Sequence, residues 1–402
     1  MKIAILGVGV VGGGTAEVLV KNKERIARSA GEEIEIKHIL CRRPRPSHPF
    51  ARVLTQDFEE ILKDESVGIV AECMGGLEPA YSYVKSALAA GKSVVTSNKE
   101  LVSERGRELC ALAREKGVHF KFEAAVGGGI PVIRPINKCL AANEISQVSG
   151  ILNGTTNYIL TEMINFGKSF EAALKEAQEK GYAESDPTAD VEGIDAARKI
   201  SILADLCFNK EVLPKYVRTE GISKISPEDI DYARAAGYRV KLIARAMRTG
   251  ANSVTAFVEP QLVAKTHPLA SINGVQNAVL IRGDAVGEVL LAGPGAGAYP
   301  TASAVVADII DAVAEPNPKI FLGWWPSEPG YAADADELSS KFLIRVGPRL
   351  KEIGENFSNI RFINKSGARA DEYAFITGYT TKKEIMEKAE AIELRAIYRL
   401  FE

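Results

Sequence analysis

Residues 194–208 form a predicted helix that carries a lysine and an aspartate on an otherwise apolar stripe. At about 100° per residue, Lys199 shares this stripe with Asp195 and with the apolar residues Ile202, Leu203 and Leu206. An exposed ion pair at this spacing stabilises a helix by only about 0.2–0.5 kcal/mol, too little to offset placing both charges against a core. The pattern therefore predicts that Lys199 and Asp195 face a closed active site, where Lys199 exchanges a proton with a substrate oxygen.

The loop before this helix is rich in carboxylates. Glu184, Asp186 and Asp190 all precede Asp195 within a short stretch. A cluster of carboxylates suits a substrate that carries an ammonium group. The same residues could form an ordinary exposed acidic turn, and both interpretations stay open at this point.

A glycine-rich motif at the start of the chain indicates a dinucleotide site. It follows a predicted buried strand, residues 2–6, and precedes a predicted helix, residues 15–29, and it reads Gly7-Val8-Gly9-Val10-Val11-Gly12. The first glycine makes the turn, the second lets a pyrophosphate approach the backbone, and the third permits close helix packing. The helix N-terminus then stabilises the phosphates. We predict cofactor contacts along this motif, at Gly7, Gly9, Val10, Val11 and Gly12; the alternative is a merely glycine-rich turn.

The end of the second predicted strand favours NADP(H) over NAD(H). An enzyme specific for NAD normally places an acidic residue there to bind the ribose 2′-hydroxyl, but this chain has Cys41-Arg42-Arg43. The guanidinium groups of Arg42 and Arg43 can pair with a 2′-phosphate, which a carboxylate would repel. The alternative is a solvated basic loop.

Another lysine follows the predicted strand at residues 93–97. The sequence there reads Ser97-Asn98-Lys99, at the carboxyl edge of the sheet, where doubly wound folds hold their ligands. We expect Lys99 to contact the cofactor or to orient the reacting oxygen. A surface lysine in a loop is the competing interpretation.

Residues 123–131, EAAVGGGIP, form a glycine-rich bend after a predicted strand. Free backbone carbonyls in such a bend can bind a hard cation. Taken alone, the bend is equally well explained as a turn between domains. The four histidines are scattered without the spacing of metal ligands.

The composition limits the function classes. The 402 residues predict two or three domains, and the net charge of −2 offers no basic field for a nucleic acid or a membrane surface. The five cysteines are widely spread without a paired spacing, which predicts neither a disulfide framework nor a zinc cluster. With no long apolar run or signal peptide, we expect a soluble, cytoplasmic protein.

The elements that position these residues predict an α/β protein. The first ~130 residues alternate as strands and helices, including predicted helices at 79–90 and 104–116, which indicates a Rossmann-type, doubly wound parallel sheet. An α+β substrate-binding domain follows. The final residues are predicted as strand, helix, strand, strand, helix, strand, the ferredoxin-like order. The predicted domains are 1–130 with about 299–320, 131–298, a linker at 321–337, and 338–402.

The longer motifs resemble those of the homoserine dehydrogenase family. The resemblance extends from residue 1 to about 315, through GVGVVGGG, TSNKELV, FEAAVGGGIPVIRP, GILNGTTNYILTEM, GYAESDPTADVEGIDAARK and GPGAGAYPTASAVVADI. It implies reversible reduction of L-aspartate 4-semialdehyde to L-homoserine with NADPH or NADH, on the route to threonine, methionine and isoleucine. It also implies a dimer or a higher homo-oligomer. The semialdehyde is then expected between the nucleotide crevice and the helix that bears Lys199.

The resemblance also implies roles for individual residues. Lys199 becomes the proton donor and acceptor, and Lys99 a second active-site lysine. Glu184 and Asp195 hold the amino-acid end of the substrate, with Asp190 supporting them. Further cofactor contacts fall on Gly75, Ser97, Gly181 and Gly297, and a sodium ion is bound by the backbone carbonyls of Glu123, Val126, Gly128 and Ile130. Where the family has Glu-Pro-Asp-Pro, this chain has Glu184-Ser185-Asp186-Pro187, so the loop lacks one proline.

The last module resembles the ACT domain, a small regulatory ligand-binding fold. Its first turn reads Val346-Gly347-Pro348-Arg349 where such domains have Asp-x-Pro-Gly. Threonine is the effector that the resemblance implies, and this departure bears directly on its binding.

Two alternatives remain open on the sequence. A related reductase of cyclic imines or amino acids would share the first 130 residues but would not need GILNGTTNYI. A regulator that senses NADPH without turnover would account for both ends of the chain, but would leave Lys199 and Asp195 on their apolar stripe unexplained.

Overall fold

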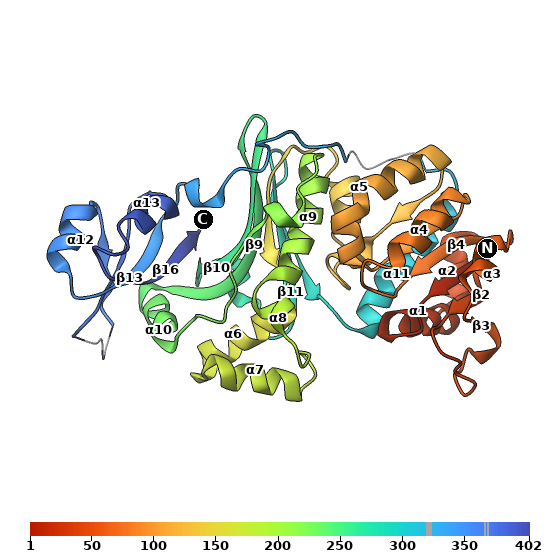
Figure 1. The fold of residues 1–402 in the computed structure, drawn as a ribbon, viewed down its shortest axis with the longest axis horizontal. Helices are drawn as coiled ribbons and strands as arrows, with labels where there is room; N and C mark the ends of the chain where they lie inside the picture. The colour runs from red at the N-terminus through yellow and green to blue at the C-terminus, as the bar shows by residue number, and fades with distance from the viewer. Residues whose placement is uncertain (319–323, 366, 368–369) are drawn as a thin grey trace. The chain divides into compact units, whose positions relative to one another are not determined.

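The computed structural model describes residues 1–318, 324–365, 367 and 370–402 (Figure 1). The chain forms two compact units. The first contains Met1–Val148, Ser201–Pro214 and Val279–Glu328, and the second contains Ser149–Ile200, Lys215–Ala278 and Pro329–Glu402. The boundary predicted at residues 320 and 321 lies outside the described residues.

The first unit is built on a parallel sheet of six strands in the order β3-β2-β1-β4-β5-β6. The strands are β1 (Lys2–Leu6), β2 (Glu35–Leu40), β3 (Leu54–Thr55), β4 (Val67–Glu72), β5 (Ser93–Thr96) and β6 (Phe120–Lys121). The strand order changes direction between β1 and β4, and this switch point is where doubly wound folds bind their ligands. The predicted Rossmann-type fold is confirmed.

Two predicted helices of the first unit differ from the observed ones, and both differences lie next to residues predicted to contact the cofactor. They are α1 (Val10–Lys21), α2 (Lys23–Ala30), α3 (Phe58–Lys63), α4 (Ala80–Ala89), α5 (Lys99–Lys116) and α11 (Ala298–Ala314). The single helix predicted at residues 15–29 is wrong, because α1 begins inside the glycine motif and Asn22 separates it from α2. The predicted start of α5 at residue 104 is also wrong, because the Asn98 side chain accepts a hydrogen bond from Leu101 N (3.1 Å) and caps the helix earlier.

The core of the first unit joins its sheet to α1 and α11. Ile3 and Ile5 of β1 are fully buried with Val305 and Ile309 of α11. The two helices approach closely at Gly14, where an added Cβ would lie 3.0 Å from the carbonyl oxygen of Ala298. Helix α11, which follows residue 297, therefore completes the hydrophobic core next to the glycine motif.

Strand β7 (Ile145–Ile151) and helix α6 (Gly154–Phe166) form around the GILNGTTNYI motif. Neither was predicted. Asn153 caps α6, because its Oδ1 accepts from Thr156 N (2.9 Å). Glycine, asparagine and threonine all have weak helix preferences, so the composition of the motif does not predict α6. Strands β11 (Gln276–Gly283) and β12 (Gly287–Pro294) lie next to one another beyond it in the chain.

The second unit contains a long antiparallel hairpin, β9 (Tyr238–Gly250) and β10 (Ser253–Ala264), with β8 (Arg218–Thr219) beside β10. Helices α7 (Phe170–Glu179), α8 (Thr188–Val191) and α10 (Pro227–Ala236) also lie in this unit. Helix α9 (Ile194–Phe208) begins in the second unit, and its residues from Ser201 onward belong to the first. Ser226 and Asp229 form a capping box at the start of α10. This mixed sheet with helices confirms the α+β class predicted after the nucleotide-binding fold.

The C-terminal module continues this sheet (Figure 1). Its elements are β13 (Phe342–Val346), α12 (Leu350–Asn356), β14 (Arg361–Phe362), β15 (Tyr373–Ile376), α13 (Lys382–Glu387) and β16 (Leu394–Phe401), in the predicted order. The strands lie side by side as β10-β16-β13-β15-β14, and β16 pairs in parallel with β10 through Gln261 and Arg399. The module and the β9–β10 hairpin therefore share one sheet.

Short helical turns connect these elements. Those of 3-10 type are Ala51–Val53, Glu123–Ala125, Pro214–Tyr216, Pro268–Ser271 and Ala335–Glu337, and a single π-helical turn spans Pro135–Cys139. Among the described helices, none is long and apolar enough to cross a membrane.

Candidate active site

Lys199 lies on α9 with its ammonium group held by two partners. Its Nζ donates to the carbonyl oxygen of Leu152 at 2.7 Å and lies 2.8 Å from Oδ2 of Asp195. Lys199 is 8% exposed and Asp195 is 6% exposed. Both side chains are buried, as the apolar stripe predicts. A buried ammonium group with fixed partners is suited to exchanging a proton at a defined position.

Asn153 joins the carboxylates to this lysine, and its role was not predicted. Its Nδ2 donates to Oδ1 of Asp190 at 2.7 Å and to Oδ2 of Asp195 at 3.0 Å. The same side chain caps α6 through its oxygen. An asparagine directly after a strand and before a helix is a capping signal, and this signal in GILNGTTNYI would have pointed to Asn153.

The carboxyl group of Asp190 has a raised pKa. Burial raises the pKa of its carboxyl group, and the nearby charge of Asp195 raises it further, while the bond from Asn153 opposes the shift. The cluster combines Asp190, Asp195 and Lys199. A site with more carboxylates than ammonium groups favours a substrate that brings its own ammonium group.

The structure does not bring the other predicted acids into this cluster. Glu184 is exposed, and its backbone carbonyl accepts a hydrogen bond from Gln178. Asp186 accepts from the backbone and hydroxyl of Thr188, which fixes the start of α8. The interpretation of Asp186 as part of a substrate cluster is therefore replaced by a local structural role.

The glycine motif of the first unit forms a tight turn at the end of β1. Gly7 has a φ of 102°, and a Cβ on Gly12 would lie 2.0 Å from the carbonyl oxygen of Gly7. Around Gly9, by contrast, an added Cβ would meet no described atom within 4 Å. Because Val10 and Val11 begin α1, their amides lie in its first turn, which can stabilise a phosphate.

Arg42 and Arg43 follow β2 and are exposed. The chain is fixed just before them, because Cys41 N donates to the carbonyl oxygen of Thr55 at 2.8 Å. Two guanidinium groups therefore extend into solvent from a fixed point at the carboxyl edge of the sheet.

The loops after β4 and β5 are tied together by a buried carboxyl group. Glu72 accepts hydrogen bonds from Met74 N at 2.6 Å and from the Thr96 hydroxyl at 2.5 Å. Asn98 reaches across in the other direction and donates to Gly76 O at 2.6 Å. Burial raises the pKa of Glu72. Sequence reasoning missed Glu72 because it ends an apolar strand without any recognisable motif.

This network positions three predicted cofactor residues. Gly75 has a φ of 80°, and its amide is 3.3 Å from Glu72. Ser97 N donates to the backbone carbonyl of Glu72 at 3.2 Å. Lys99 is the first residue of α5 and is partly buried, so it does not lie in a loop as the alternative interpretation has it.

The bend at residues 123–131 uses its acidic side chain to bind backbone amides. The carboxylate of Glu123 accepts from Val132, Ile133 and Arg134 at 2.6, 2.8 and 2.7 Å. Gly128 adopts a φ of 58°. Within the described bend, the carbonyl of Gly127 accepts from Ile130 N, whereas those of Val126, Gly128 and Ile130 receive no hydrogen bond.

Carbonyl oxygens without donors fit a hard monovalent cation. Among the described residues, no group of three or more His, Cys, Asp or Glu side chains is suited to a metal ion.

The remaining predicted cofactor residues are glycines with left-handed backbones. Gly181 has a φ of 74° and ends the turn after α7, and Gly297 has a φ of 119° and precedes α11. A side chain would strain either position.

The parallel sheet with its glycine turn, and the buried lysine–carboxylate cluster, define an NAD(P)-dependent oxidoreductase. The family model described as "Homoserine dehydrogenase, NAD binding domain" matches residues 7–123, and the model described as "Homoserine dehydrogenase" matches residues 131–310. The chain belongs to the homoserine dehydrogenase family.

Individual relatives agree with this assignment. A homoserine dehydrogenase of Pseudomonas aeruginosa is 48% identical over 314 residues, which cover 78% of this chain and 72% of the relative. The crystal structure of a homoserine dehydrogenase from Thiobacillus denitrificans matches with a TM-score of 0.89 and 38% identity, over 100% of this chain and 98% of that one. A hyperthermophilic archaeal homoserine dehydrogenase, solved in complex with NADPH, matches with a TM-score of 0.67 and 29% identity, over 78% of this chain and 98% of that one.

Proposed function

We propose that the chain catalyses the reversible reduction of L-aspartate 4-semialdehyde to L-homoserine with NADP(H), and that Lys199 is the proton donor and acceptor. The observation that carries this proposal is the buried ammonium group of Lys199, held between Leu152 O and Asp195. In the reductive direction the ammonium form of Lys199 would give a proton to the aldehyde oxygen. In the oxidative direction the neutral amine form would take the proton from the hydroxyl group.

The carboxylates recognise the amino-acid end of the substrate. Asp190 and Asp195 share the amide of Asn153 and carry the negative charge that an ammonium group needs. Glu184 lies on the exposed turn before α8, outside this pair, and the family resemblance supports it as a further contact to the amino-acid end of the bound substrate.

The cofactor is held by the first unit and supplies or accepts the hydride when it is bound. The turn at Gly7, Gly9 and Gly12 and the amides of Val10 and Val11 bind the pyrophosphate. Gly75, Ser97 and Lys99 would hold the nicotinamide half, and the family resemblance supports Gly181 and Gly297 as further cofactor contacts. Arg42 and Arg43 pair with the 2′-phosphate, so NADP(H) is preferred and NAD(H) remains a possible substrate. The NADPH complex of the archaeal relative supports this choice.

A sodium ion in the bend is also part of the proposal. The free carbonyls of Val126, Gly128 and Ile130 provide ligands, and the carbonyl of Glu123 is the fourth. Because the carboxylate of Glu123 is engaged by three amides, it contributes to the shape of the bend and its backbone oxygen is the ligand.

The family resemblance supports the remaining proposals. They are a place in threonine, methionine and isoleucine biosynthesis, a cytoplasmic location, a homodimer or higher homo-oligomer, and threonine as an effector of the ACT-like module.

Turnover with purified protein tests the proposed function. L-homoserine is mixed with NADP+ or NAD+, and the absorbance of the reduced nicotinamide is followed, with L-proline, L-lysine and L-malate as controls. We expect homoserine, but none of the three control compounds, to reduce the cofactor. We also expect NADP+ to be reduced faster than NAD+. No reduction of either cofactor with homoserine would refute the proposal.

A further inference from the structure

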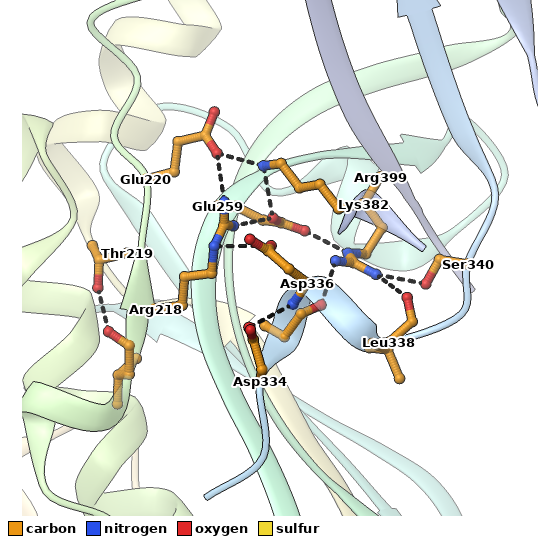
Figure 2. A network of polar contacts seen from close by, with 12 residues as sticks. Arg218, Thr219, Glu220, Glu259, Asp334, Asp336, Leu338, Ser340, Lys382 and Arg399 are labelled. Carbon is orange, nitrogen blue, oxygen red and sulfur yellow. Dashed lines mark hydrogen bonds and ion pairs between the residues drawn. The ribbon is translucent and has the colours of Figure 1, made fainter. Parts of the chain in front are cut away.

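Six charged side chains form a cluster inside the second unit that the proposed reaction does not use (Figure 2). We call it the charged cluster; its members are Arg218, Glu220, Glu259, Asp336, Lys382 and Arg399. Lys382 and Arg399 belong to the C-terminal module, whereas Arg218 and Glu259 lie on β8 and β10. The cluster therefore connects the module to the strands of the same sheet that lie outside it.

Glu259 is the centre of the charged cluster. It is 2% exposed, and its Oε1 accepts from Nε of Arg399 at 2.6 Å. Its Oε2 lies 3.3 Å from Nη1 of Arg218 and 3.6 Å from Nζ of Lys382. Lys382 also contacts Glu220 at 2.7 Å. A buried carboxylate that faces three cations contributes little to stability, because the cost of desolvating the charges offsets their attraction. The structure therefore favours a role for Glu259 in holding its neighbours in fixed positions.

Glu220 connects the charged cluster to the segment at residues 218–222. Its backbone amide donates to Val258 O at 2.7 Å, which pins the segment to β10. Just beyond, Ile222 N donates to Val191 O at 2.8 Å. A Cβ on Gly221 would lie 2.3 Å from that same oxygen. The segment therefore packs against the turn at residues 191–193 with no room for a methyl group.

That turn connects two residues of the candidate active site. It lies directly between Asp190 on α8 and Asp195 on α9. The carbonyl of Gly193 accepts from Ala197 N at 2.9 Å and so begins α9. The segment at 218–222 therefore contacts the turn that joins the two carboxylate residues bridged by Asn153.

We propose that Lys382 and Glu220 are positioning residues of the substrate site. Through the segment at 218–222, their ion pair holds Asp190 and Asp195 at the spacing that binds the substrate ammonium group. The C-terminal module thus supports the active site through Lys382 and the segment at 218–222. This inference rests on the proposed homoserine dehydrogenase activity.

The test compares Lys382→Met with Lys383→Met in the full-length protein. Lys383 is the adjacent residue, and its exposed pair with Glu337 at 2.9 Å includes no member of the charged cluster. For Lys382→Met we expect the KM for homoserine to rise about three- to tenfold, with the KM for NADP+ changed by less than about twofold. Lys382→Arg keeps the charge and should recover most of the wild-type KM.

A second variant keeps the test decisive if Lys382→Met does not fold. Glu220→Gln changes the more exposed partner of the pair, and Glu337→Gln is its matched control. We expect the same selective rise in the KM for homoserine. Wild-type turnover is measured first: if the wild type does not oxidise homoserine, the proposed function fails and this inference fails with it. If the wild type is active but the variants behave like their controls, or lose affinity for both substrates equally, the positioning role alone is refuted.

Discussion

The amide of Asn153 donates to Oδ1 of Asp190 and to Oδ2 of Asp195, at 2.7 and 3.0 Å. One neutral side chain thereby holds two carboxylates that would otherwise repel each other, next to the ammonium group of Lys199. The Oδ1 atom of Asn153 also caps the N-terminus of α6, because it accepts a hydrogen bond from Thr156 N. The site therefore depends on the residue that caps a helix for both its geometry and its charge balance.

Asn153→Asp should separate these two duties. Aspartate keeps the capping oxygen but lacks the donor and adds a negative charge between Asp190 and Asp195. We expect kcat/KM for homoserine to fall by about tenfold or more, from the loss of hydrogen bonds to charged groups, while α6 remains capped. Steady-state kinetics combined with thermal unfolding tests this.

Asn153→Ala is the matched comparison. It removes the cap as well, so the free energy of unfolding should fall by about 1 kcal/mol in addition to the loss of activity. If both variants retain the wild-type KM for homoserine, the bridging role is wrong.

Arg42→Ala should change the choice of cofactor. Removing one guanidinium group from the 2′-phosphate is expected to raise the KM for NADP+ by about tenfold and to leave the KM for NAD+ unchanged. Arg45→Ala, in the same exposed loop, is the control. An equal rise in both KM values would indicate that the loop was damaged and that Arg42 does not read the phosphate.

Asp308 should make stability depend on pH. Burial raises the pKa of its carboxyl group to about 7, and the nearby charge of Glu123 adds to the shift. Because the folded state favours the protonated acid, its contribution to stability is complete below the ordinary value of 3.8 and is lost as the pH rises through about 7. The free energy of unfolding should therefore fall between about pH 5 and pH 8 more in the wild type than in Asp308→Asn. Denaturant titrations at the two pH values measure this; parallel curves for the two proteins would show that Asp308 does not titrate in this range.

The sequence alone predicted those parts of the site whose residues follow a local pattern within one helix or one turn. Lys199 and Asp195 are found by helical periodicity, and Gly7, Gly9 and Gly12 by their spacing after a strand. Both signals are local, because they depend on residues within one or two turns of each other.

Other parts depend on contacts that spacing does not show. Glu184 and Asp190 belong to the same acidic loop, yet only Asp190 is brought to Asp195, because side-chain direction in a turn is fixed by the surrounding fold. Glu259 and Arg399 are distant in the chain and meet only because β10 and β16 pair. Helix α6 was missed because its capping motif consists of residues that usually form loops.

The most direct measurement of the central claim is the turnover of Lys199→Ala. We predict that kcat for homoserine oxidation falls by about 100- to 10,000-fold, the range expected for loss of a general acid–base, while the affinity for NADP+ stays within about twofold. Lys175→Ala, which removes an exposed lysine of α7, should match the wild type. A Lys199→Ala variant that binds NADP+ and keeps the wild-type kcat would contradict the assignment of Lys199 as the proton donor and acceptor.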